Sequence, residues 1–448
     1  MTRFERFAIA AGGVCLVGAL LLACSRAAAP SKNLVLVSID TLRADLLGCY
    51  GSPRPTSPTL DALAARGVLF ETALAAAPWT LPSHASLLTG RYPSRIGVQR
   101  AGATLPADVP TWAAWLRERG FATLGIVNSR WLEARSGLDR GFAHHHWVEE
   151  NVRRREPSSV GEIAAAWLSL DPPEPFFLFL HLYDLHSDYS SLPSYERMFK
   201  TPYAGRIDGS TRQLRAIREG HLKLRKGDVA QLRNLYAAGI RQLDDVLARL
   251  VRVLEEQGLT ERTFLVLTSD HGEEFREHGS VLHGRTQFDE VLRVPLVFVG
   301  PGLPAGVRVR EPVSLVDVMP TALALLGQPA PAAVDGVDLS PLWEGSGASL
   351  GERFLFGEAD WRNEEDGSLR WVRQGSFKLI HDRRNGERRL YDLIHDPREQ
   401  VNVLAEHPKI ADELWAALEE FASGARASDG DTWLSTEDLE RLRALGYF

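Results

Sequence analysis

Five short apolar runs constrain the fold of this chain most strongly. Each is rich in Val, Leu, Ile and Phe and is shorter than a typical helix, as expected for parallel strands that are buried on both faces. They span residues 34–39, 122–127, 176–181, 264–269 and 296–300. Helical patterns lie between them, the clearest from about Val229 to Glu256, with Gly258 as its stop. We therefore predict an α/β fold with a large, mostly parallel sheet sandwiched by helices.

The pattern changes after about Leu342. Short alternating segments at 369–374, 377–382 and 388–393 are followed by a helical pattern from about Pro408 to Ser423. This predicts a small antiparallel sheet with one helix, and a chain of 448 residues is long enough to form it beside a large core. We place the main α/β domain at 33–342 and the C-terminal subdomain at 343–448.

The N-terminal residues have the features of an export signal. Arg3 and Arg6 precede an apolar stretch at 7–23, which ends at Cys24. The run LLAC at 21–24 resembles the lipobox of bacterial lipoproteins, in which the cysteine is acylated. We therefore expect residues 1–24 to be a signal peptide, and Cys24 to anchor the protein by lipid at the cell envelope or periplasm. A signal cleaved elsewhere and an uncleaved anchor helix are the alternatives.

Polar residues follow four of the apolar runs, at the point where each predicted strand ends. Ligands bind beyond the carboxyl ends of strands in open α/β sheets, so these positions are the informative ones. A lone Asp there is usually a cap or a turn residue, but convergence from four strands predicts a site. The residues concerned are Asp40, Asn128, Arg130, His181, Asp184, His186, Asp270 and His271.

Three of these residues have the chemistry of metal ligands. Asp40, Asp270 and His271 can offer two carboxylates and one imidazole to a divalent cation. Such a set leaves coordination positions for a nucleophile and a substrate oxygen.

Thr80 is the candidate nucleophile. It directly precedes a predicted helix, with Pro82 near the first turn and Gly90 at the end. A hydroxyl there would lie at the positive helix terminus, where backbone amides can hold an anion and a nearby cation can lower the hydroxyl pKa. The alternative is that Thr80 only caps the helix.

Four sequence blocks carry the most specific signal in the chain. They are SIDTLRADLLGCYG at 38–51, PSHASLLTGRYP at 82–93, HLYDLHSDY at 181–189 and SDHGEEFREHG at 269–279. In sequence and in order they resemble blocks of the sulfatase family of the alkaline phosphatase superfamily. Later runs such as VPLVFVGPG and LYDLIHDPREQVN extend the similarity from about Asn33 to the C-terminus. The resemblance implies an alkaline phosphatase-like fold and ester hydrolysis.

The resemblance also implies roles for individual residues. Asp40, Thr80, Asp270 and His271 would bind a metal, and Thr80 would attack sulfur or phosphorus. His186 and His283 would contact the ester or its leaving group. The predicted substrate-binding residues are His84, Asn128, Arg130 and His181.

Two departures from the family pattern bear on the chemistry. Sulfatases convert a cysteine or serine to formylglycine, but this chain has Thr80 there, so no formylglycine is expected. Thr41 and His271 stand where many sulfatases carry aspartate and asparagine. Among Ca²⁺, Mn²⁺ and Zn²⁺, this change shifts the expectation from Ca²⁺ toward Mn²⁺ or Zn²⁺.

Two further groups of histidines could be taken for metal sites. Asp184, His186, His278 and His283 could form a second metal site, although we expect a single metal, with these histidines as hydrogen-bond donors and acids. The run at 144–146 is expected to lie on a loop rather than to bind metal.

The sequence thus predicts a metal-dependent hydrolase of sulfate or phosphate esters that acts through a covalent intermediate on Thr80. The alternatives are a phosphodiesterase or phosphonate hydrolase, a phosphoethanolamine- or phosphoglycerol-type transferase, and a noncatalytic envelope lipoprotein. The expected partner is an anionic small-molecule, glycan or lipid ester. A net charge of −7 argues against nucleic acid. The Lys- and Arg-rich stretch at 196–228 is expected to be a solvated loop or short helices, with a lid over an anionic substrate as the alternative.

Overall fold

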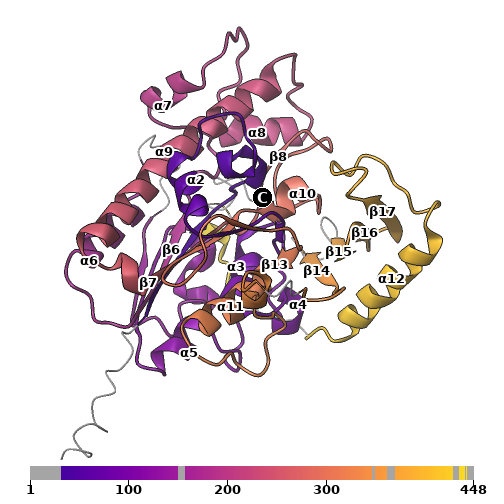
Figure 1. Cartoon of the computed structure of the whole chain (residues 1–448). Helices are drawn as coiled ribbons and strands as arrows, with labels where there is room; N and C mark the ends of the chain where they lie inside the picture. Colours follow the sequence, from indigo (N-terminus) through magenta and orange to yellow (C-terminus); the bar gives the residue numbers. More distant parts are fainter. Residues whose placement is uncertain are drawn as a thin grey trace, which may run out of the picture.

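A mixed eight-stranded sheet forms the centre of the molecule (Figure 1). The structure, a computed structural model, describes residues 32–149, 157–345, 349–360, 369–426, 433–438 and 440. The strand order is β12-β2-β11-β7-β1-β6-β4-β5. The bounds are β1 Asn33–Ile39, β2 Val68–Phe70, β4 Ala122–Val127, β5 His144–Trp147, β6 Phe176–Leu182, β7 Thr263–Thr268, β11 Leu296–Val299 and β12 Val307–Val309.

The five predicted strands are confirmed, with one correction of direction. β1 pairs in parallel with both β6 and β7, and all residues of these three strands are buried. β11, predicted to be parallel, instead runs antiparallel to β7 and β2. A continuous apolar run indicates burial on both faces, and it carries no information on strand direction.

Helices cover both faces of the sheet. On one face, α2 Pro58–Ala65, α6 Val160–Leu168 and α9 Asp228–Glu256 pack against Val35, Val37 and Ile39 of β1. On the other face, α3 Thr80–Thr89, α5 Trp112–Arg117 and α11 Val318–Leu325 pack against Leu34 and Leu36. The alternation along β1 thus divides its side chains between two cores. The predicted helix at 229–256 is confirmed as α9.

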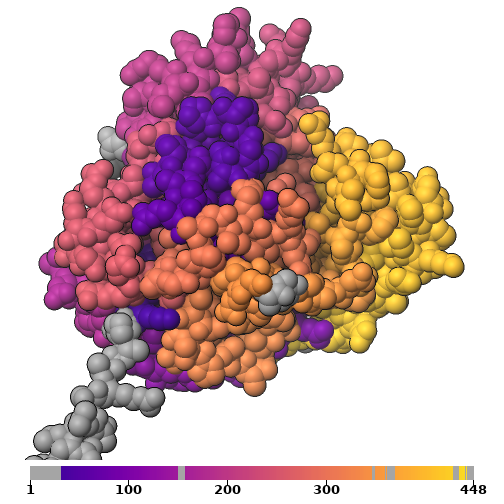
Figure 2. All heavy atoms as spheres, in the orientation of Figure 1, coloured from indigo at the N-terminus to yellow at the C-terminus, as the bar shows by residue number. Residues whose placement is uncertain are grey.

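The C-terminal part forms the predicted antiparallel sheet and helix, which lie at one side of the main body (Figure 1; yellow in Figure 2). Its strands are β14 Leu355–Ala359, β15 Leu369–Gln374, β16 Phe377–Asp382 and β17 Glu387–Asp392, and the helix is α12 Pro408–Ser423. Leu414 and Leu418 of α12 pack on Val372 and Leu379 of the sheet. The exact boundary at 342/343 remains a prediction.

Short elements complete the fold. The stretch at 196–228 contains α8 and the end of α7, in agreement with the prediction of loops or short helices. The short elements are α4 Pro93–Ile96, α7 Pro193–Met198, α8 Thr211–Arg218, α10 Asp289–Leu292, β3 Ala73–Leu74, β8 Glu274–Phe275, β9 Val281–Leu282, β10 Arg293–Val294 and β13 Val313–Ser314.

The prediction that residues 144–146 lie on a loop is wrong, because they belong to β5 at the edge of the sheet. β5 pairs in parallel with β4. His144 and His146 are exposed while His145 is half-buried beside Phe142, so the alternation of the strand points neighbouring rings in opposite directions. This geometry does not gather the three rings around one ion.

The predicted signal peptide and the anchor at Cys24 lie outside the described residues. Within the described ranges, no helix combines the length and the apolar composition needed to span a membrane.

A buried charge network joins the C-terminal sheet to the main domain. Lys378 of β16 is fully buried, and its Nζ lies 2.7 Å from Asp289 Oδ1 and 2.8 Å from Glu399 Oε1. Replacing Lys378 by methionine would leave the buried carboxyl group of Glu399 without its cation and Asp289 with only the more distant Arg373, at 3.9 Å. We expect Lys378→Met to lower the free energy of unfolding by about 3–5 kcal/mol, measured by urea denaturation. The exposed control Lys409→Met should change it by less than about 0.5 kcal/mol, and equal effects of the two changes would contradict this role.

Candidate active site

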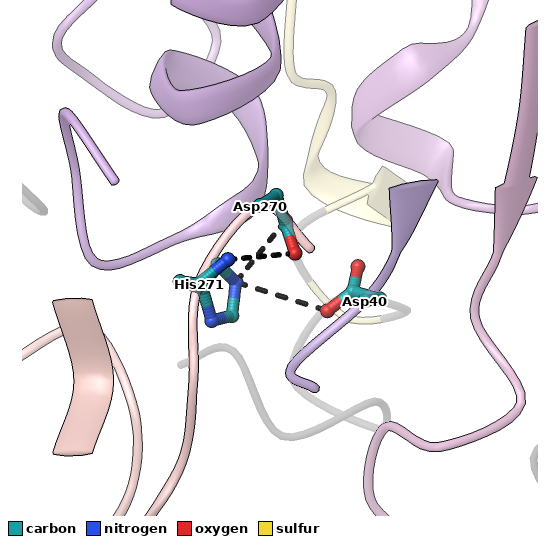
Figure 3. Close-up of side chains that lie close together, drawn as sticks. All are labelled: Asp40, Asp270 and His271. Atoms are coloured by element: carbon teal, nitrogen blue, oxygen red, sulfur yellow. Dashed lines mark hydrogen bonds and ion pairs between the residues drawn. The ribbon is translucent and has the colours of Figure 1, made fainter. Parts of the chain in front are cut away.

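Adjacent parallel strands bring two carboxylates and an imidazole together. Asp40 directly follows β1, and Asp270 and His271 follow β7 (Figure 3). His271 Nε2 lies 3.7 Å from Asp40 Oδ1 and 3.3 Å from Asp270 Oδ2. The three side chains are fully enclosed. This is the predicted cluster, and in the described part of the chain it is the one group with metal-ligand spacing.

Backbone hydrogen bonds aim the carboxylate of Asp270. Its Oδ1 accepts from the amide of Thr41 at 3.3 Å and from that of His271 at 2.9 Å. Thr41 reaches this position with a φ of 61°, a left-handed conformation that is uncommon for a β-branched residue. Since Oδ1 is bound to the loop, Oδ2 is left to face the cluster.

The cluster has the properties of an incomplete cation site. Asp40 Oδ1, Asp270 Oδ2 and His271 Nε2 are buried and have no hydrogen-bond partner. One ligand atom from each of the three residues lies within 4.8 Å of the other two. Burial raises the pKa of both carboxyl groups, and each is raised further by a nearby carboxylate. His271 Nδ1 donates to the carbonyl of Gly272 at 2.9 Å, so Nε2 carries the lone pair. These donors fit a divalent cation. Its positive charge would offset the desolvation of the two carboxylates and the repulsion from nearby negative charge.

Thr80 places a hydroxyl beside this cluster. It is the first residue of α3, whose N-cap is Trp79, and its Oγ donates to Asp40 Oδ2 at 3.4 Å. The helix ends at Gly90 with a φ of 67°, as predicted. No side-chain capping bond forms at this terminus, so the structure does not support the alternative that Thr80 only caps the helix.

His84 lies behind Thr80, and a contact with a substrate oxygen remains a prediction. It is fully buried one turn further along α3. Its Nδ1 lies 2.9 Å from the carbonyl of Thr80 and 3.4 Å from Asp270 Oδ2, while Nε2 lies 2.9 Å from Ser38 Oγ. A carbonyl can only accept, so Nδ1 is the donor and Nε2 accepts from Ser38. His84 therefore positions Thr80 and Asp270.

His181 also contacts the cluster rather than an open surface. It lies in β6, fully buried, with Nε2 3.1 Å from Asp40 Oδ2. Burial lowers the pKa of His181 to about 3, so the ring is neutral. Because His181 and Thr80 both donate to Oδ2, the other oxygen of Asp40 is left for a cation. A direct substrate contact of His181 remains a prediction.

His186 and His283 line the least enclosed side of the site, with 3% and 6% of their surface exposed. Their ring centroids are 4.9 Å apart, and the ring of His283 lies 4.3 Å from that of His271. Tyr183 stacks on His186 at 4.3 Å. Contact of either histidine with the ester or its leaving group remains a prediction.

Glu273 is a functional candidate that the sequence reasoning missed. It is fully buried, and its Oε1 lies 3.1 Å from His283 Nδ1. Burial raises the pKa of Glu273 to about 8, whereas burial and the Arg218 charge lower that of His283 to about 3. The available signal was its place in the SDHGEE block, three residues after Asp270.

Asn128 and Arg130 have different surroundings. Asn128 Oδ1 accepts from the Tyr183 amide at 2.9 Å, and the residue lines a cavity of about 670 Å³ together with His186. Arg130 forms ion pairs with Asp438 and, at 3.5 Å, with Glu133. Asn128 thus lies beside the site, whereas Arg130 engages the C-terminal segment. Substrate binding by either residue remains a prediction.

In the described part of the chain, the alternative second set does not appear as a group with metal-ligand spacing. Asp184 accepts from the hydroxyl of Ser158 at 2.9 Å. His278 stacks on Phe288, with Nδ1 2.5 Å from Glu290 Oε1 and Nε2 3.0 Å from the carbonyl of Glu399. Asp184 and His278 are thus held by groups other than His186 and His283.

Comparisons with known proteins identify the family of this chain. The sulfatase family model matches residues 32–328, and the model of the C-terminal region of N-sulphoglucosamine sulphohydrolase matches residues 276–424. The chain is 25% identical to a Δ4,5-hexuronate-2-O-sulfatase of Bacteroides thetaiotaomicron, covering 89% of this chain and 91% of that protein. It is 28% identical to human arylsulfatase A, covering 90% and 89%.

Solved structures share the fold. A phosphonate monoester hydrolase of Agrobacterium radiobacter superposes with a TM-score of 0.74 at 24% identity, covering 91% of this chain and 98% of that protein. A protein solved with its substrate D-glucosamine-2-N,6-O-disulfate gives 0.75 at 22%, covering 88% and 98%. The family match over most of the chain, together with this architecture, shows that the protein belongs to the sulfatase family of ester hydrolases.

Proposed function

We propose that this protein is a metal-dependent hydrolase of sulfate or phosphate-type esters in which Thr80, as encoded, is the nucleophile. The observation that carries the proposal is the position of Thr80 Oγ, 3.4 Å from Asp40 Oδ2, at the edge of three converging ligand atoms. A helix N-terminus beneath the hydroxyl adds backbone amides for an anionic group. Family membership supports the reaction class.

Asp40 Oδ1, Asp270 Oδ2, His271 Nε2 and Thr80 Oγ would hold the cation. When bound, a divalent cation supplies positive charge that lowers the pKa of the threonine hydroxyl and balances the nonbridging oxygens of the ester. Two carboxylates, one imidazole and one hydroxyl suit Ca²⁺, Mn²⁺ or Zn²⁺, and the imidazole favours the latter two.

The side chains provide a route for each proton. Thr80 Oγ bonds to sulfur or phosphorus as the bond to the leaving oxygen breaks, and its proton passes to Asp40 Oδ2, its hydrogen-bond partner. The leaving oxygen takes a proton from His283 or His186. Water then attacks the same sulfur or phosphorus atom and gives a proton to the histidine that donated to the leaving oxygen. Asp40 returns its proton to Thr80 Oγ as the bond to Thr80 breaks, and the oxyanion is released.

Glu273 gives His283 a source for this proton. With a pKa of about 8, Glu273 holds its proton at neutral pH and can donate it to His283 Nδ1. When Nδ1 of His283 accepts this hydrogen bond, the neutral ring carries its own hydrogen on Nε2. As Nε2 gives its proton to the leaving oxygen, Nδ1 takes the one from Glu273, and the ring stays neutral.

We expect Glu273→Gln to lower kcat by about 10–100-fold while the metal content stays unchanged, because glutamine keeps a hydrogen bond to His283 but supplies no acidic proton. Steady-state kinetics and metal analysis of the same preparations check this. Glu274→Gln, a change at the equally buried neighbour, is the matched control. The same loss in both variants would contradict a specific role for Glu273.

We further propose that the natural substrate is an anionic ester met at the cell envelope, with the protein anchored through Cys24. The Arg3–Cys24 segment supports export. The relatives named for sulfated sugars support a glycan ester.

A panel of aryl substrates tests the proposed function. The metal-reconstituted protein would be assayed with a sulfate ester, a phosphate monoester, a phosphate diester and a phosphonate ester. Sulfate turnover that requires Thr80 would establish a sulfatase that works without formylglycine. Turnover of only the phosphate diester or the phosphonate ester would show that the protein hydrolyses phosphorus esters and not sulfate esters. Turnover of none of the four by metal-loaded protein would contradict the proposal.

A further inference from the structure

Helix α8 connects the loops that carry the two outer histidines of the site. At its N-terminus, the hydroxyl of Thr211 donates to Asp188 Oδ1 at 2.6 Å, and Asp188 follows His186 by two residues. The body of α8 packs against β9, which directly precedes His283. Figure 1 shows α8 beside β8. This helix is therefore fixed over the least enclosed side of the site.

The helical spacing of α8 places basic side chains on the face that packs over the least enclosed side of the site. Leu214 and Ile217 are buried in the core below the helix. Arg218 follows Leu214 by four residues and so lies on the same face, with Arg215 one turn before it. Both arginines are half-buried, whereas Arg212 on the same helix is exposed. Arg285 comes two residues after His283 on the adjoining loop.

These guanidinium groups are close to one another and to the reactive histidine. Burial, together with repulsion from Arg285 and Arg215, lowers the pKa of Arg218 to about 10. Arg218 in turn lowers the pKa of His283. Glu219 and Glu273 are acidic groups that act on Arg218 in the opposite direction. Arg218 thus shares this side of the site with two further arginines, Arg215 and Arg285.

We propose that Arg215, Arg218 and Arg285 form an anion-binding subsite that receives a carboxylate on the alcohol side of the ester. Planar guanidinium groups bind carboxylates through paired hydrogen bonds, and partial burial strengthens such contacts. The position beside His283, the proposed donor to the leaving oxygen, places the subsite at the leaving group. This inference rests on the proposed function, and it defines the substrate as an ester of an acidic alcohol, such as an acidic sugar.

The test compares two esters and their two free alcohols. The first ester is a para-nitrophenyl ester of the type, sulfate or phosphorus, that the substrate panel shows to be hydrolysed. The second ester is the same compound with a carboxylate added to the ring. We expect the wild-type protein to prefer the carboxylated ester in kcat/KM and to bind its free alcohol more tightly in calorimetric titration. Arg218→Ala should reduce each preference about tenfold, the usual size of one charge-assisted contact. Added salt should also reduce both preferences.

Arg212→Ala, on the exposed face of the same helix, is the matched control and should leave both preferences unchanged. A wild-type protein without any preference for the carboxylated compounds would overturn the subsite. An Arg218→Ala variant that retains the preference would do so too. If neither ester is turned over, the proposed function fails, while the binding of the free alcohols still tests the subsite.

Discussion

Thr80→Val is expected to lower kcat/KM for ester hydrolysis by about 10³–10⁶-fold, the range seen when a catalytic nucleophile is removed. Valine keeps the branched shape of threonine inside the fully buried first turn of α3 but has no hydroxyl. The remaining side chains would still hold the ester in place, so KM should change far less than kcat. Steady-state kinetics on the best ester of the panel check this result.

Thr80→Ser is the matched control because serine retains the hydroxyl that donates to Asp40. We expect it to keep activity within about tenfold of the wild-type protein. Both variants should fold, since α3 is held by the core around Leu81, Leu87 and Leu88. A Thr80→Val variant with wild-type turnover would exclude Thr80 as the nucleophile.

Asp270→Asn is expected to remove the metal and the activity together. The amide cannot replace the charge of Oδ2, a buried oxygen without a hydrogen-bond partner in the cluster. We expect metal affinity to fall by about 100-fold or more, and kcat to fall in proportion to the metal lost. Metal analysis after dialysis and kinetics at increasing metal concentration measure the two effects.

The variant Asp184→Asn distinguishes a protein with one metal site from a protein with two. Asp184 belongs to the alternative second set, but its carboxylate accepts from Ser158. We therefore expect this variant to retain the metal content of the wild-type protein. Loss of metal from Asp184→Asn, or full metal content with full turnover in Asp270→Asn, would contradict the assignment.

Residues that follow a strand in the sequence were the most predictable part of the site. Asp40, Asp270 and His271 come directly after buried apolar strands, and parallel pairing of β1 and β7 places strand ends side by side. Thr80 was predictable because Pro82 and Gly90 mark the ends of a short helix. In each case the local pattern and the tertiary position agree.

Contacts between distant segments were not predictable. Arg130 pairs with Asp438, a residue 308 positions away, and no local pattern indicates this partner. The same applies to His278, which contacts Glu290 and the backbone of Glu399 instead of a metal set. The direction of β11 also escaped prediction, because it depends on how the chain returns to the sheet. Charge and burial at such positions depend on the whole fold.

The central claim is that the ester group passes through a covalent bond to Thr80. The most direct test is to quench the metal-loaded protein during turnover of its best ester and to determine the mass of the peptide that contains Thr80. We predict a sulfated or phosphorylated form of this peptide, with the added group on Thr80, that appears during turnover and is absent from Thr80→Val. An unmodified peptide throughout rapid turnover, or an adduct on another residue, would contradict the account.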